Sequence, residues 1–265
     1  MATLTDPARE LGEIAGRLAH GSSESGDKFL ARQFGVDRWS TEFVKIVACI
    51  LERADLVART IGDSDLDVDH KESALDHISG FKAGFIGDAL RKPWNDAGQG
   101  ITAMKDHGGP IKFLSQTVRP VVNYPRLTDE EIAELIEAID TYIEHVRANE
   151  DEFAFVRQAI VDGLSLFRFQ LEHIGWMGAG YALTAFREVL FVYEASSRAI
   201  QSEGNPDAAK FLKGFWDIIT AFKAKAEAAK SWREAAEMVR DTYTIAASVA
   251  TPLLLTGHLP SLPAS

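Results

Sequence analysis

Hydrophobic residues recur at three- and four-residue spacing along most of the chain. The clearest run lies between residues 43 and 61, where one helical face carries Phe43, Ile46, Val47, Ile50, Ala54, Val57 and Ile61. This period is typical of an amphipathic helix that packs on a core. The hydroxyl of Ser40 can cap the free N–H groups of the first turn. The pattern therefore predicts a long helix that begins directly after Ser40.

Weaker stripes predict further helices in the first half of the chain. Asp6 followed by Pro7 is a helix-start signal. A second helix is expected over about 71–91, with its apolar face at Leu75, Ile78, Phe81, Phe85 and Leu90. Pro110 is expected to open a short helix that carries Phe113, Leu114 and Val118. The segment 119–126 contains two prolines and is expected to be extended, because residues before proline avoid the helical region.

The strongest local signal is a helix start at Thr128. Thr128 and Glu131 have the spacing of a capping box, in which each side chain accepts a hydrogen bond from the backbone N–H of the other residue. A strict apolar stripe follows, at Ile132, Leu135, Ile136, Ile139, Tyr142, Ile143 and Val146. The other face is acidic and includes Glu130, Glu134 and Glu137. The sequence predicts an amphipathic helix with a negatively charged outer face.

The most apolar long segment covers residues 164–193 and contains no proline. Three glycines near its middle, Gly175, Gly178 and Gly180, predict two helices or one interrupted helix at the centre of the core. The sequence lacks the two-residue alternation and regular turn signals of strands. We therefore expect an all-α protein, a multi-helix bundle of about eight to ten helices with no sheet. Residues 1–120 and 121–265 are expected to form two helical halves, or one continuous domain.

The charge balance of the chain limits its partners and its compartment. Its 265 residues carry a formal net charge of −11, with a pI near 5.1. Clustered Lys and Arg drive phosphate binding, so this balance argues against nucleic acid as a partner. Cys49 is the only cysteine, which excludes an intramolecular disulfide. Since the first residues also lack the basic start and apolar run of a signal peptide, the expected location is cytoplasmic.

Acids and histidines gather around the start of the 71–91 helix. The candidate metal ligands are Asp65, Asp67, Asp69, His70, Asp76 and His77. Counted from Asp65, acids occupy positions 1, 3, 5 and 12 of a calcium loop, but His70 stands where the sharp turn requires glycine. Alternatively, His70 and His77 share a helical face and could bind a transition metal with Asp76 nearby. We favour a solvated loop in which Asp69 caps the helix and no cofactor is bound.

Polar side chains within residues 164–193 are the candidates for acid–base chemistry. Arg168 and Glu172 stand one helical turn apart, and His173 follows. A buried acid beside a histidine can transfer protons, but an ion pair between Arg168 and Glu172 is the simpler expectation. The sequence contains no HExxH, GxSxG, phosphate-loop or dinucleotide motif. An enzymatic function is therefore not favoured.

The last part of the chain has a different charge pattern. Residues 210–240 carry seven basic side chains against four acidic ones, interleaved with aromatic residues. Residues 242–259 contain no Asp, Glu, Lys or Arg. A membrane-directed effector that uses residues 206–259 would account for this pattern. Pro252 and several hydroxyl residues make a weak span, so we favour a tail that packs on the core.

The leading functional hypothesis is a non-catalytic cytoplasmic interaction or regulatory protein. It would self-associate through its charged amphipathic helices, because complementary charges steer association and set register. The interaction candidates are Glu130, Glu134, Glu137, Lys213, Lys223 and Lys230. The alternatives are the membrane-directed effector and a metal-dependent helical hydrolase that uses the acids and histidines of residues 63–77.

Overall fold

The computed structural model describes residues 4–95, 99–148, 154–203 and 213–222, and in them the chain is mostly helical. The first helices are α1 (Pro7–Leu18), α2 (Gly26–Phe34), α3 (Thr41–Gly62), α4 (Val68–Ala83), α5 (Asp88–Arg91), α6 (Gln99–Phe113) and α7 (Ser115–Val118). They are followed by α8 (Asp129–Ala148), α9 (Ala154–Glu172), α10 (Ile174–Met177) and α11 (Ala179–Glu203), and residues 213–222 are also helical. The prediction of an all-α bundle is confirmed.

One small sheet departs from the expectation of no sheet. The two-residue strands β1 (Leu4–Thr5) and β2 (Tyr124–Pro125) pair antiparallel, with Thr5 opposite Tyr124. The expected extended segment 119–126 is therefore extended only around β2, because residues 119–122 form turns. This pairing ties the start of the chain to the segment that leads into α8.

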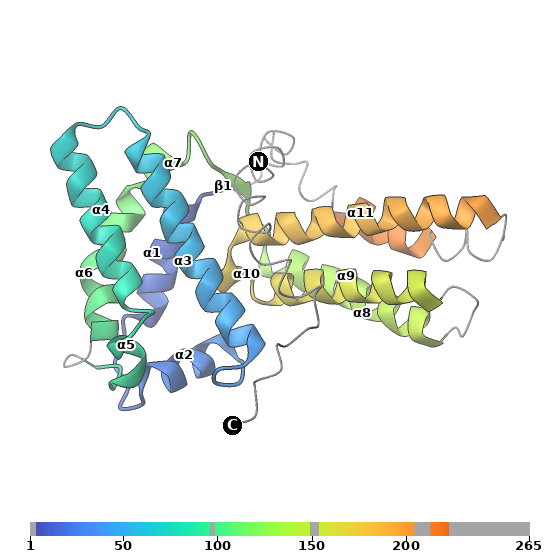
Figure 1. Ribbon diagram of the computed structural model, residues 1–265, viewed down its shortest axis with the longest axis horizontal. Helices are drawn as coiled ribbons and strands as arrows, with labels where there is room; N and C mark the ends of the chain where they lie inside the picture. The colour runs from blue at the N-terminus through green and yellow to red at the C-terminus, as the bar shows by residue number, and fades with distance from the viewer. Residues whose placement is uncertain (1–3, 96–98, 149–153, 204–212, 223–265) are drawn as a thin grey trace, which may run out of the picture.

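The helices form two groups that meet at α10 (Figure 1). In the first group α1 packs on α6 and α3, and α4 packs on the same two helices. In the second group α9 packs between α8 and α11. Helix 213–222 joins this group, since the Phe215 ring stacks on Tyr142 at a centroid distance of 6.1 Å and the Phe222 ring meets Phe167 at 5.0 Å. The division into separate halves at residue 120 stays a prediction.

Two helix starts are confirmed in detail. The Ser40 hydroxyl accepts a hydrogen bond from the Phe43 N–H at 3.1 Å, and α3 begins at Thr41, directly after Ser40. At α8 the Thr128 N–H donates to the Glu131 carboxylate at 2.9 Å, while the Glu131 N–H donates to the Thr128 hydroxyl at 3.2 Å. Both caps satisfy backbone donors that the helix itself leaves unpaired.

The expected 71–91 helix is wrong at both ends. α4 begins at Val68 and stops at Ala83, and α5 is a separate turn after Gly87, whose φ of 56° lies in the region that favours glycine. The N-cap is Asp67 rather than Asp69. Leu75 is 39% exposed, because Ala74 takes its place on the face that contacts the core.

The expected helix start at Pro110 is also wrong, because α6 already begins at Gln99 and runs through Pro110. A proline inside a helix removes one hydrogen bond. Close packing outweighs that loss here, since a Cβ added to Gly108 would lie 2.3 Å from the Ala15 Cβ of α1. Phe113 is 76% exposed at the end of α6.

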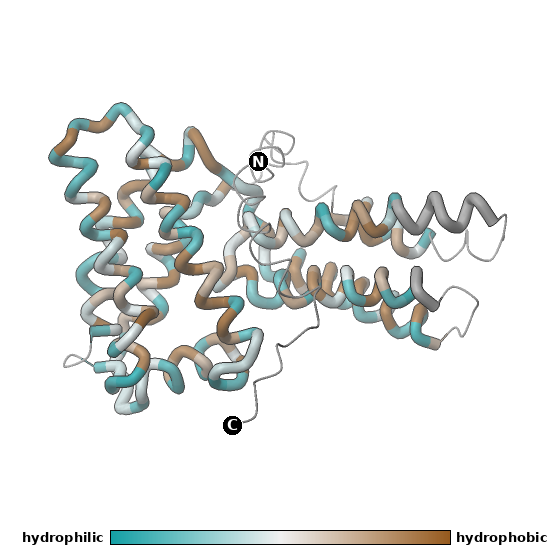
Figure 2. The backbone as a smooth tube through the Cα atoms, in the orientation of Figure 1, coloured by the Kyte–Doolittle hydropathy of each residue, from teal (hydrophilic) through white to brown (hydrophobic). Residues whose placement is uncertain are grey.

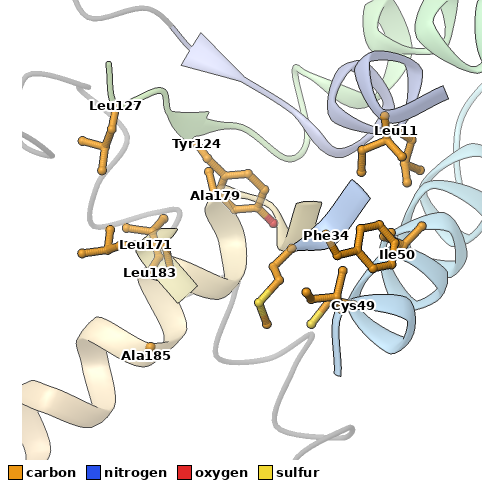
Figure 3. Packing of buried hydrophobic residues seen from close by; sticks show 14 of the residues in the cluster. Leu11, Phe34, Cys49, Ile50, Tyr124, Leu127, Leu171, Ala179, Leu183 and Ala185 are labelled. Carbon is orange, nitrogen blue, oxygen red and sulfur yellow. The ribbon is translucent and has the colours of Figure 1, made fainter. Parts of the chain in front are cut away.

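The central apolar segment is interrupted as predicted. α9 ends at Glu172, and α11 begins after Gly178, whose φ of 98° lies in the region that favours glycine. Along the helices of both groups, apolar stretches alternate with polar ones (Figure 2). In the core, Tyr124 lies between Leu11 and Ile50 on one side and Leu171 on the other (Figure 3). One continuous core therefore joins the two groups.

Candidate functional site

A buried ion pair lies where the two helical groups meet. Arg53 of α3 is only 1% exposed, and its Nη1 lies 2.9 Å from Oε2 of Glu10 on α1. The same guanidinium donates from Nε to the Cys49 carbonyl at 3.4 Å and from Nη2 to the Trp176 carbonyl. The other Glu10 oxygen accepts the Ala179 N–H at 3.1 Å. The pair thus connects α1 and α3 to the start of α11.

Burial acts against the charge of Glu10, and Arg53 and a backbone N–H act in its favour. Burial raises the pKa of the Glu10 carboxyl above its ordinary value, against the opposing effects of the Arg53 guanidinium and the Ala179 N–H. Gly178 leaves the space that the pair occupies, because a Cβ there would lie 2.6 Å from Arg53 Nη1 and 2.7 Å from Glu10 Oε2. Sequence reasoning missed the pair. The available signal was a single arginine on the apolar face of α3, between Ile50 and the other buried positions.

A groove of about 790 Å³ adjoins the ion pair, with Glu10 in its wall. Its apolar floor comes from the segment before α8, from α8 itself and from the α9–α10 junction: Leu127, Ile132, Ile136, Leu171 and Ile174. Four carboxylates and two guanidinium groups also line it: Glu10, Glu13, Asp129, Glu172, Arg17 and Arg126. The groove combines an apolar floor with a surplus of negative charge.

Both arginines of the groove are engaged within the chain. Arg126 forms a two-pronged ion pair with Glu13, with Nη1–Oε1 at 3.1 Å and Nη2–Oε2 at 3.3 Å. Arg17 donates to the Gly175 carbonyl, and its guanidinium carbon lies 4.0 Å from the centre of the Trp176 ring. Three of the four lining carboxylates are engaged too, Glu10 with Arg53, Glu13 with Arg126 and Glu172 with Arg168. The acids that a ligand would meet are therefore the exposed Asp129 and the acids on the adjoining face of α8.

The predicted interaction acids lie on the exposed face of α8, beside the groove. Glu130, Glu134 and Glu137 are all exposed, while Leu135 and Ile139 on the other face are buried. Ala133 and Ile136, between these faces, line the groove. Lys213 is exposed, and Lys223 and Lys230 lie outside the described residues.

The candidate metal ligands do not converge on one point. The carboxylates of Asp65, Asp67, Asp69 and Asp76 are exposed. The His70 N–H donates to the Asp67 carboxylate at 2.9 Å, and Nδ1 of the His70 ring lies 2.6 Å from Oδ2 of the same carboxylate. Both contacts lower the pKa of Asp67. His77 instead faces His107 of α6, a residue that sequence reasoning did not select. In the described ranges, no three His, Cys, Asp or Glu side chains gather as a metal site.

The polar residues of the central segment are held in structural contacts. Arg168 pairs with Glu172 at 2.9 Å, as expected, and also with Asp140 of α8 at 2.6 Å. Nδ1 of the buried His173 lies 2.9 Å from the Phe169 carbonyl oxygen. Burial raises the pKa of the Cys49 thiol to about 12, which disfavours the reactive thiolate at neutral pH. Arg168, Glu172 and His173 are thus held by contacts within and between helices, and those contacts do not form an acid–base pair.

Comparisons with known proteins add no functional information. No protein-family model, curated protein or solved structure matches the chain. Over the described part of the chain, none of the helices has both the length and the apolar character needed to cross a bilayer. The predicted membrane-directed segment 206–259 lies largely outside the described residues.

Proposed function

We propose that this is a non-catalytic helical interaction protein whose groove binds a basic amphipathic helix. The observation that carries the proposal is the combination of partly exposed apolar residues in the groove, Ile132 and Ile136, with the exposed Asp129 and the exposed acids along the adjoining face of α8. An amphipathic helix binds by placing apolar side chains in such a groove, while its charged side chains meet the rim. Complementary charge then selects the partner and the register.

The proposed occupant is the basic region of a second copy. Residues 210–240 carry seven basic side chains and four acids. Phe215 and Phe222 are buried in the core of their own chain, so the basic side chains and the exposed Trp216 supply the chemistry that the groove would recognise. Because each copy carries both a groove and a basic region, a reciprocal exchange forms a closed dimer. The proposed compartment is the cytoplasm, on the ground of a single buried cysteine.

The first test is the mass of the full chain in solution. Light scattering over a range of protein concentrations should give a mass that rises from one 29.1 kDa chain to two. The dimer should weaken between about 0.05 and 0.5 M salt, because screening shortens the reach of surface charges. A monomeric mass at every concentration and at low salt would remove the basis of the self-association proposal.

Charge-swap variants identify the surfaces involved. Reversal of the acids, Glu130→Lys with Glu134→Lys and Glu137→Lys, should leave a monomer, and so should Lys213→Glu with Lys223→Glu and Lys230→Glu. A mixture of the two triple variants should form a heterodimer, because each supplies the charge that the other now needs. The matched control reverses three exposed acids on α4 and α6, at Glu72, Asp76 and Asp106, and should still dimerise.

A substitution in the groove floor separates groove binding from charge attraction alone. Ile136→Lys places a charge in the apolar floor and should weaken dimerisation by about tenfold or more, as expected for a buried contact residue. Circular dichroism establishes that each variant is folded. Unchanged dimerisation of Ile136→Lys would show that the groove is not the docking surface, even if the charge-swap result holds.

A further inference from the structure

Two histidines meet between α4 and α6, away from the groove. His77 of α4 and His107 of α6 approach with their Nδ1 atoms 3.0 Å apart, and their ring centres lie 5.3 Å apart. Both side chains are half-buried at the contact between the helices. Thirty residues separate them in the sequence, so only the packing of α4 on α6 brings them together.

The orientation of the His107 ring is set by a gap in α4. Gly80 lies three residues after His77 and therefore on the same helical face. A Cβ added to Gly80 would lie 2.1 Å from His107 Nε2, so the ring occupies the space that a side chain would fill. Nε2 thus lies against α4, and Nδ1 is turned toward His77.

Either a hydrogen atom or a cation must lie between the two Nδ1 atoms. A neutral imidazole carries a proton on one nitrogen and a lone pair on the other. At 3.0 Å, two Nδ1 atoms are joined either by a proton on one of them or by a cation that both coordinate. If both rings carry their proton on Nε2, the two lone pairs are available for a metal ion.

The separation of the two nitrogens fits coordination of a single ion. Transition metals bind imidazole nitrogen at about 2.0–2.1 Å, so two neighbouring ligand nitrogens lie about 2.9 Å apart in octahedral and about 3.3 Å apart in tetrahedral geometry. The observed 3.0 Å falls within this range.

We propose that His77 and His107 form a two-histidine site for a divalent transition-metal ion, with water at the remaining positions. Imidazole ligands select Cu²⁺, Ni²⁺ and Zn²⁺ over Mg²⁺ and Ca²⁺, and Cu²⁺ binds most tightly of the three. The bound ion links α4 to α6. The site is distinct from the acidic loop at residues 65–70, and its existence does not depend on the proposed dimer.

Calorimetric titration of the full chain with Ni²⁺ and with Zn²⁺ tests the site. One ion should bind per chain. His77→Gln and His107→Gln should each lower the affinity by at least about tenfold, because even the loss of a residue that only orients a metal ligand has an effect of that size. The matched controls are His70→Gln, in the acidic loop, and His145→Gln, on exposed α8, and both should bind like the wild type. Ni²⁺ should also broaden the ring NMR signals of His77 and His107 in the wild type before those of other histidines.

The same experiments can overturn the proposal. If the wild type binds no more tightly than the His77→Gln and His107→Gln variants, only a proton joins the two rings. If His70→Gln abolishes binding, the acidic loop is the metal site instead. The NMR measurement uses the wild type, so it still decides the question if either variant fails to fold. Early broadening of the signals of histidines other than His77 and His107 would refute the site.

Discussion

Glu10→Gln should destabilise the protein far more than its small change in shape suggests. Glutamine fills the same volume and can still accept the Ala179 N–H, so the variant creates no cavity. It leaves Arg53, which is 1% exposed, with only the Trp176 and Cys49 carbonyls as acceptors. Removal of one partner of a buried ion pair costs about 3–5 kcal/mol, because the remaining charge is buried without compensation.

A double-mutant cycle isolates the interaction between the two charges. Arg53→Met alone leaves the Trp176 carbonyl without its donor, a loss of about 1–3 kcal/mol, and leaves Glu10 with the Ala179 N–H as a partner. The double variant Glu10→Gln with Arg53→Met buries no unpaired charge. Its cost should therefore fall well below the sum of the single costs, with a coupling energy of about 2 kcal/mol or more.

Urea unfolding, followed by circular dichroism, measures these free energies. The matched control is Glu172→Gln, which breaks the exposed pair with Arg168 and should cost less than about 0.5 kcal/mol. A cost for Glu10→Gln as small as that of this control would refute the reasoning. So would a double variant whose cost equals the sum of the two single costs, since the charges would then not interact.

Two further predictions concern backbone conformation and pH. Gly178→Ala should lower the free energy of unfolding in urea by about 2–4 kcal/mol, because the backbone is strained for alanine and the Cβ meets Arg53. Gly163→Ala lies inside α9, with the nearest neighbouring atom 3.7 Å from the added Cβ, and should instead raise it by about 0.5–1 kcal/mol. An equal effect of both alanines would contradict this account. Burial opposes ionisation of Asp27, but hydrogen bonds from Ser25, from the Trp39 indole and from a backbone N–H, with the Arg38 charge, outweigh it and lower the pKa. The ionised Asp27 should therefore stabilise the folded protein above pH 3.8, and this effect should be lost as the pH falls through the folded pKa. The thermal unfolding temperature of Asp27→Asn should depend less on pH than that of the wild type in this acid range. Identical pH dependence of the two proteins would refute the assignment.

Local interactions explain why the sequence predicted most helices correctly. The Ser40 cap and the box formed by Thr128 and Glu131 involve residues three positions apart, so their outcome depends on the chain within a single turn. The interruption at Gly178 was visible for the same reason, because glycine tolerates a positive φ at little cost. The exposed acidic face of α8 likewise follows from the helical period of its apolar residues.

Contacts between distant residues decided the features on which function would depend. Glu10 and Arg53 are 43 positions apart, and no local pattern shows that an arginine in an apolar stripe pairs with a carboxylate on another helix. His77 was selected together with nearby acids and His70, whereas its ring contacts His107, which α6 supplies from thirty residues away. Packing also carried α6 through Pro110 and moved Leu75 to the surface. Periodicity reports which face of a helix is apolar, whereas only the tertiary structure determines which helix covers that face and which charges meet across the contact.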